Sequence, residues 1–166
     1  MRRFLDSLYS VTAYLAALCM IGVLLMVVSG VVTRQIGVHI PGTDAYAGYL
    51  MAAAGFFALA STFKHGEHIR VTLILNSLKP AGHRRLDLFA LVVGILLATS
   101  LAYFSCKLVM DSLTYNDIST GNDATPLWIP QLSMAVGAVI FLIAIIDEFV
   151  RRLMGHAAPV SSQQHE

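Results

Sequence analysis

The hydrophobic and polar positions of the chain form long blocks and do not alternate over short distances. Four stretches of 19 to 27 residues contain no Asp, Glu, Lys or Arg. An α-helix needs about 20 residues to cross a hydrocarbon core about 30 Å thick, and it satisfies its own backbone hydrogen bonds there. The pattern therefore predicts an all-α integral membrane protein with four transmembrane helices, at about residues 8–33, 45–63, 87–107 and 127–149.

The first uncharged stretch follows a basic start, as a secretory signal would. Its apolar run is about twice the 7 to 15 residues of a signal core, and no small-x-small cleavage site closes it. The bulky Leu18 before Cys19 also differs from a lipoprotein acceptor site. We therefore expect a retained first helix in a single membrane domain, residues 1–154, followed by a flexible cytoplasmic tail, residues 155–166.

Composition supports a membrane protein, because 57% of the residues are hydrophobic and only 13% are charged. Little of the chain remains for a soluble domain. No glycine-rich phosphate loop, nucleophile and base pair, or nucleic-acid surface is present in the sequence. We therefore predict that the protein is not an enzyme, needs no cofactor and binds no nucleic acid, and that its contacts are with membrane lipids and protein partners.

The basic residues are distributed unevenly between the predicted loops. Nine of the eleven Lys and Arg residues lie before the first helix, between the second and third, or after the fourth. Cytoplasmic loops carry such an excess, so both termini and the middle loop are predicted to be cytoplasmic. The polar stretch FKHGEHIRV, residues 63–71, is then explained as the basic flank of a membrane helix.

The middle loop contains a segment with two possible structures. Val71, Ile74, Leu75 and Leu78 share one side at helical spacing, which favours an amphipathic helix lying in the membrane interface. Several residues of the segment are β-branched, which is also compatible with an extended linker. We adopt the interfacial helix as the interpretation and keep the linker as the alternative.

Small residues mark helix faces that allow close packing in lipid. The predicted third helix carries a row at every fourth position, and the second helix has small residues on two sides, which predicts packing on both. The first helix carries bulky residues all round, as lipid exposure requires. The two rows considered as contact faces are Ala90, Gly94, Ala98, Ala102 and Cys106 in the third helix, and Ala45, Gly48, Ala52 and Gly55 in the second.

Candidate chemistry is confined to the middle loop. His65 and His68 are spaced to place two metal ligands on one helical face, but no third or fourth ligand accompanies them. All six histidines lie in loops or tails, which disfavours a haem within the bundle. No predicted helix carries an ionisable residue at its centre, so a self-contained transporter is disfavoured. A standalone four-helix redox or metal protein using the loop histidines remains the alternative function.

Two sequence elements resemble the small permease subunit of tripartite ATP-independent periplasmic (TRAP) transporters, the DctQ-type component. The resemblance covers nearly the whole chain, from Arg34 at the end of the first helix to the basic end of the fourth. At the start of the second helix, TDAYAGY has Asp44 as its only acid, where many members have paired acids. The elements are H-I-R-V, namely His68, Ile69, Arg70 and Val71, and P-x-W-I-P-Q, namely Pro126, Trp128, Ile129, Pro130 and Gln131.

The resemblance implies a division of labour between three proteins in the bacterial inner membrane and periplasm. A periplasmic substrate-binding protein captures an organic acid, and a large TRAP membrane permease subunit carries it across on an ion gradient. The small subunit braces the large one and binds no substrate. In this scheme Trp128 marks the outer membrane interface, and the motif and small residues named above serve structure and subunit contact.

Overall fold

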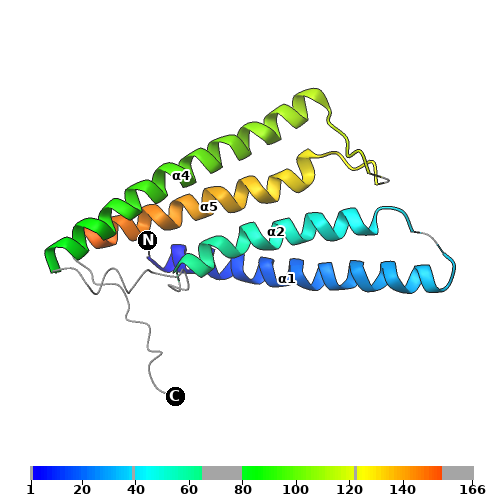
Figure 1. Cartoon of the computed structure of the whole chain (residues 1–166), viewed down its shortest axis with the longest axis horizontal. Coiled ribbons are helices and arrows are strands. Elements are labelled where there is room, and N and C mark those ends of the chain that lie inside the picture. The colour runs from blue at the N-terminus through cyan, green and yellow to red at the C-terminus, as the bar shows by residue number, and fades with distance from the viewer. Residues whose placement is uncertain (1, 39, 65–79, 122, 155–166) are drawn as a thin grey trace, which may run out of the picture.

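The computed structural model describes residues 2–38, 40–64, 80–121 and 123–154, and these residues form four helices (Figure 1). No strand occurs among them, and the one β-bridge is the isolated pair Ile118 and Pro126. All four helices are long and apolar enough to cross a membrane. The four-span prediction is therefore confirmed. The helices are α1 (Arg2–Gln35), α2 (Thr43–Lys64), α4 (Pro80–Tyr115) and α5 (Trp128–Leu153).

The helices extend beyond the uncharged stretches that predicted them. The third helix was expected to end near residue 107, whereas α4 continues to Tyr115, so Lys107 lies about two turns inside the helix and not at its edge. A helix does not stop where the hydrocarbon core ends, because charged residues are good helix formers in water. Absence of charge therefore predicts the membrane-buried part of a helix and not its full length.

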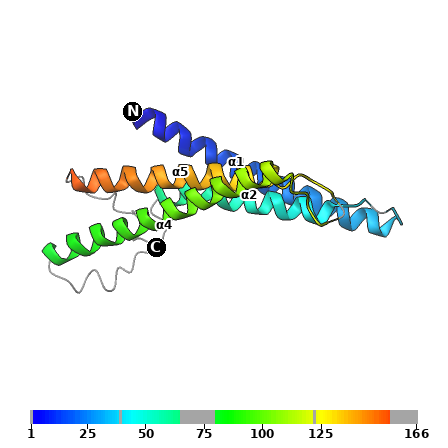
Figure 2. The ribbon, with the colours of Figure 1, turned by 90° about the horizontal axis from the view of Figure 1, so that it is seen from above.

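Each helix packs mainly on its neighbour in the order α1, α2, α5, α4 (Figure 1). Seen from above, the helices overlap near the middle, and the starts of α1 and α4 lie on opposite sides of α5 (Figure 2). We call the end with the α1–α2 and α4–α5 connections the loop end, and the opposite end the terminal end. The two outer helices, α1 and α4, do not pack extensively on each other. The arrangement is therefore an open row of helices, with α2 and α5 in the middle.

Helices α2 and α5 approach each other closely at Gly137. A Cβ atom built on Gly137 would lie 2.7 Å from Cβ of Phe56 and 2.8 Å from its carbonyl oxygen. Ala138 and Ala60, one on each of these helices, are fully or almost fully buried. Small residues let two backbones approach in lipid, where no hydrophobic effect drives helices together. Gly137 is thus needed at this crossing because no side chain fits.

The predicted small-residue row on α4 is only partly correct. Ala98 and Ala102 are buried, but Ala90 and Cys106 are exposed. Four residues turn a helix by about 400°, so a row at every fourth position drifts by about 40° per step and leaves the contact face. The face that is buried alternates spacings of three and four, as a straight stripe requires. Its members from Ala98 onward are Ala98, Ala102, Ser105, Val109 and Ser112.

The outer helix α1 contacts α2 along one side, and near its start Tyr9 is buried against both α2 and α5. Gly22 lies against the Leu50 side chain, and Gly30 against Thr43. Bulky residues cover the remaining surface, and Leu24 and Leu25 are both exposed. Such a surface is suited to lipid, as the sequence predicted for this helix.

Candidate functional site

The terminal end of α4 and α5 is joined by a cluster of charged side chains. The guanidinium of Arg152 donates hydrogen bonds to Glu148, one turn earlier on α5 at 2.8 Å, and to the Asp87 carboxylate of α4. The side chains of Arg152, Glu148 and Asp87 are only 11%, 16% and 27% exposed. Arg151 lies 3.5 Å from Glu148 and is more exposed. We call Asp87, Glu148 and Arg152 the charged clamp.

The loop end carries a second polar cluster, made by α2 and the segment that connects α4 to α5. The Tyr49 hydroxyl lies 2.9 Å from Ser119 Oγ and 3.1 Å from Asp123 Oδ2, and Ser119 donates to Asp123 Oδ1 at 2.8 Å. Thr125 Oγ1 lies 3.1 Å from the Tyr46 hydroxyl, within hydrogen-bond distance. We call Tyr46, Tyr49, Ser119, Asp123 and Thr125 the hydroxyl cluster.

Hydrogen bonds in this cluster favour the ionised form of its one carboxyl group. Hydrogen bonding by Thr125, and then by Ser119 and Tyr49, outweighs the opposing effect of burial and lowers the pKa of Asp123 from 3.8 to about 2. Asp123 is therefore ionised at any pH above the usual pKa range of an aspartic acid. A negatively charged acceptor makes the hydrogen bonds stronger than those between neutral groups.

Arg34 and Asp44 form an ion pair at the loop end, between the end of α1 and the start of α2. Arg34 Nη2 lies 2.8 Å from Asp44 Oδ2, and both side chains are well exposed. Exposed pairs of this kind contribute about 0 to 1 kcal/mol. The pair therefore fixes the α1–α2 connection only weakly.

Gly48 and Gly55 of α2 lie on a face that the rest of the described chain leaves uncovered. A Cβ atom built on either glycine meets nothing within 4 Å. Ala52, between them, is exposed as well, while Ala53 and Ala54 on the other sides are buried. The described residues of this chain therefore leave one of the two small faces of α2 open, and packing on both faces stays a prediction.

Gly94 and Ala98 meet α5. Ala98 is buried together with Leu91 and Ile145, and a Cβ atom on Gly94 would sit 3.9 Å from Ile145 Cγ2, which is ordinary contact. The α4 row is thus used inside the chain, for packing of α4 on α5.

The P-x-W-I-P-Q element forms the start of α5. Pro126 precedes the helix and Trp128 begins it, while Pro130 lies in the first turn, where a missing N–H leaves no intrahelical bond unmade. The carboxamide oxygen of Gln131 is buried without a hydrogen-bond partner among the described residues. Pro130 also lines an open groove of about 360 Å³ with Met26, Tyr46 and Leu50. The groove lining carries no Asp, Glu, His, Lys or Arg.

The H-I-R-V element and the histidine pair lie outside the described residues, and so does the predicted interfacial helix. His65, His68 and Arg70 therefore receive no structural account. Within the described parts of the chain, no group of three His, Cys, Asp or Glu residues could hold a metal ion.

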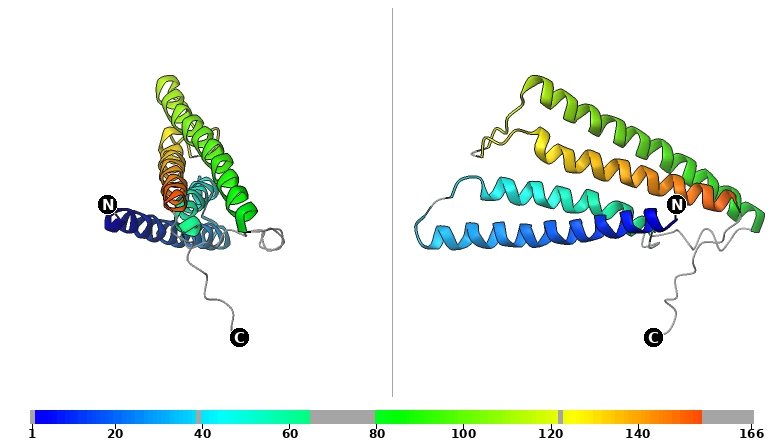
Figure 3. Two further views of the ribbon diagram at one scale, coloured as in Figure 1. Left: turned by 90° about the vertical axis from the view of Figure 1, so that its left-hand side faces the viewer. Right: turned by 180° about the vertical axis from the view of Figure 1, so that it is seen from behind.

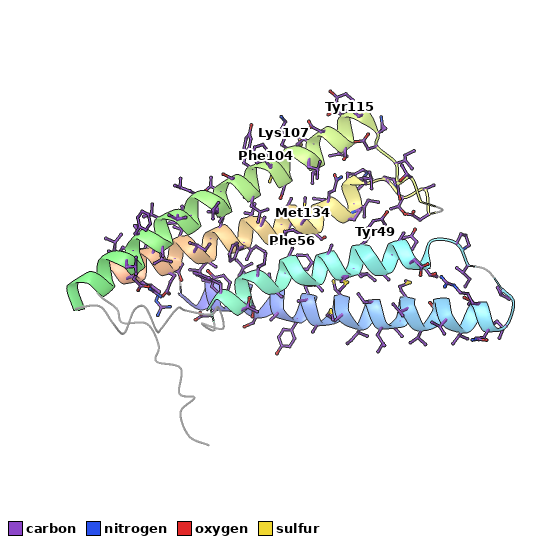
Figure 4. All side chains as sticks on the ribbon, viewed as in Figure 1. Tyr49, Phe56, Phe104, Lys107, Tyr115 and Met134 are labelled. Carbon is purple, nitrogen blue, oxygen red and sulfur yellow. The ribbon has the colours of Figure 1, made fainter. Side chains whose placement is uncertain are left out.

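Sequence reasoning missed three features that the fold brings together. The charged clamp joins residues 65 positions apart, and the hydroxyl cluster joins residues 70 to 79 apart, so neither leaves a local pattern. Gly137 could have been found, because Gly137 and Ala144 are seven residues apart and so place two small residues on one side of α5. The side of α4 that faces away from α5 is aromatic and basic instead, with Phe104, Lys107 and Tyr115 (Figure 4).

Fold and contacts together define a polytopic membrane protein that has four spanning helices and an uncovered packing face. The chain belongs to the family described as tripartite ATP-independent periplasmic transporters, DctQ component, which it matches over residues 23–155. The match runs from the middle of α1 to the end of α5 and confirms the resemblance inferred from the sequence motifs. No curated protein matches the chain.

Proposed function

We propose that the chain is the small membrane subunit of a TRAP transporter of the bacterial inner membrane, where it braces the large permease subunit. That subunit takes up an organic acid on an ion gradient, after a periplasmic binding protein delivers it. The observation that carries the proposal is the family match over residues 23–155, which includes three complete helices and part of α1. The chain itself contributes no catalytic group to this process.

A brace must keep its shape while its partner moves, and three contacts supply that stiffness. The α2–α5 crossing at Gly137 is too close to slide without a clash. The charged clamp joins α4 to α5 at the terminal end. The hydroxyl cluster joins the α4–α5 connection to α2 at the loop end. The middle helices are thus linked to each other and to α4 by contacts that resist displacement.

The uncovered face of α2 is the contact that we assign to the large subunit. Its glycines, Gly48 and Gly55, allow a partner helix to approach the α2 backbone closely. The α4 row does not serve this purpose, because Ala98 is already buried against α5. Arg34, Asp44 and Trp128 lie near the loop end, where charged and aromatic groups would anchor the brace at the membrane interface.

Replacing Gly55 by leucine should abolish or strongly reduce recovery of the large subunit with a tagged small subunit. The added side chain enters open space in this chain, so its folding should be unharmed, whereas overpacking at a helix contact costs about 1 to 3 kcal/mol. Recovery is measured by affinity purification from membranes, and uptake by reconstitution. Helical content of the purified variant reports folding.

Ala90→Leu is the matched control, because Ala90 is also a small exposed residue but lies on α4. It should leave recovery of the large subunit unchanged. If Gly55→Leu and the parent chain recovered the large subunit equally well, α2 would be excluded as the contact helix. If no large subunit accompanies even the parent chain, the proposed function itself fails.

Topology provides a separate prediction from the distribution of basic residues. Reporter fusions at Asn122 should be active in the periplasm, and fusions at Pro80 and Ser161 in the cytoplasm, because nine of eleven basic residues flank the opposite ends of the helices. An inverted pattern would show that the loop end faces the cytoplasm. Nothing in the family match or in the described residues favours the alternative of a metal or redox protein.

A further inference from the structure

The loop end of α4 is joined to α2 through the segment that connects α4 to α5. At the terminal end α4 and α5 converge, and the charged clamp and the contact of Leu91 with Ile145 hold them together. The two helices diverge toward the loop end, as Figures 1 and 3 show. Because α4 packs on α5 and not extensively on α2, the described part of the connecting segment, residues 116–121 and 123–127, links the last turn of α4 to α2.

The described residues of the connecting segment form a hydrogen-bonded turn and not an extended linker. The Ser119 amide donates to the Thr125 carbonyl at 2.8 Å, and the Leu127 amide donates to the Asp117 carbonyl at 3.0 Å. The Asp117 amide in turn donates to the Ser112 carbonyl at 3.1 Å, at the end of α4. These bonds make the segment, the end of α4 and the start of α5 move together.

The hydroxyl cluster attaches this folded turn to α2. Tyr49 and Tyr46 provide the α2 side, and Ser119, Asp123 and Thr125 provide the turn side. The backbone before α2 approaches as well, since a Cβ atom on Gly42 would lie 2.9 Å from Cβ of Asp123. Gly42 has φ +87°, a conformation that glycine adopts without strain. The contact therefore combines charge-assisted hydrogen bonds with a close backbone approach.

We propose that the hydroxyl cluster is a conformational latch that sets the separation between the loop end of α4 and α2. The charged clamp ties α4 to α5 at the terminal end, and Val109 and Ser112 near the loop end of α4 are buried as well, so the two helices move as one pair. Opening the latch lets the loop end of this pair move away from α2, with the α2–α5 crossing at Gly137 as the pivot. The latch is a property of this chain and does not require that the large subunit contact α2.

The test measures two distances by pulsed electron spin resonance. The full-length chain is purified from membranes into lipid nanodiscs, with any subunit that accompanies it. Cys19 and Cys106 are replaced by serine, and spin labels are placed on pairs of exposed positions. The pair Met51 and Thr114 reports α2 against the loop end of α4, and the pair Met51 and Val136 reports α2 against α5.

Removing the latch hydroxyls with Tyr49→Phe and Ser119→Ala should shift the Met51–Thr114 distances to longer values and broaden them. The Met51–Val136 distances should stay as in the parent, because the Gly137 crossing is intact. Tyr103→Phe removes a hydroxyl from an exposed tyrosine of α4 and should change neither pair. The proposal is overturned if the Met51–Thr114 distribution is unchanged, or if both pairs broaden together, which would indicate general loosening and no latch.

Discussion

Replacing Arg152 by methionine is expected to lower the free energy of unfolding by about 3 kcal/mol, because it leaves the carboxylates of Asp87 and Glu148 near each other without their cation. Removing one partner from a fully buried pair costs about 3 to 5 kcal/mol, and Asp87 retains some exposure to solvent, which places the effect at the lower end. Methionine keeps most of the side-chain volume, so the loss reports charge and not a cavity. The measurement is reversible unfolding of the purified chain in detergent or nanodiscs.

Two further variants separate the charge effect from other causes. Arg151→Met removes a neighbouring cation that lies 3.5 Å from Glu148 and is 33% exposed, and it should cost only about 0 to 1 kcal/mol. Adding Asp87→Asn and Glu148→Gln to Arg152→Met should restore most of the lost stability, because no carboxylate of the charged clamp is then left without its cation, and the remaining charge on Arg151 is partly exposed. Equal losses from the Arg151 and Arg152 variants would mean that the clamp does not hold α4 to α5.

Gly137→Ala is expected to destabilise the chain although alanine is the better helix former. The new Cβ atom would lie 2.7 Å from Cβ of Phe56 and 2.8 Å from its carbonyl carbon and oxygen, and backbone atoms cannot rotate away as a side chain can. Overpacking costs about 1 to 3 kcal/mol, against a gain of up to about 1 kcal/mol in helix propensity. The same unfolding measurement reports the net change.

Gly55→Ala is the matched control for the packing effect at Gly137. Both glycines lie within spanning helices, but a Cβ atom at Gly55 meets nothing within 4 Å. The control should therefore keep only the gain in helix propensity, so that the two variants differ by about 2 kcal/mol in unfolding free energy. If Gly137→Ala were as stable as Gly55→Ala, the α2–α5 crossing would be wider than the structure has it.

The four membrane spans could be predicted from the sequence because the membrane imposes a requirement on composition alone. A stretch such as residues 124–146 must be apolar to enter lipid, whatever it packs against. The family could be predicted for a similar reason, since the P-x-W-I-P-Q element from Pro126 to Gln131 is local in the sequence. Helix ends such as Tyr115 could not be predicted from the absence of charge, because a helix tolerates charged residues outside the hydrocarbon core.

The packing partners of the helices could be decided only by the tertiary structure. Small residues at Gly48, Gly55, Gly94 and Gly137 look alike in the sequence, yet Gly137 is at a close crossing, Gly94 is in ordinary contact and the other two face open space. Which face a small residue belongs to depends on helix rotation, and rotation is set by all contacts at once.

By itself, then, the sequence determined that the chain crosses the membrane four times as helices, because the cost of placing polar groups in lipid acts on each segment separately. The tertiary structure alone decided the order α1, α2, α5, α4 and the pairing of Arg152 with Asp87 and of Tyr49 with Asp123. These pairs are 65 and 74 residues apart, and such contacts form only when helix packing brings distant side chains to the same end of the molecule.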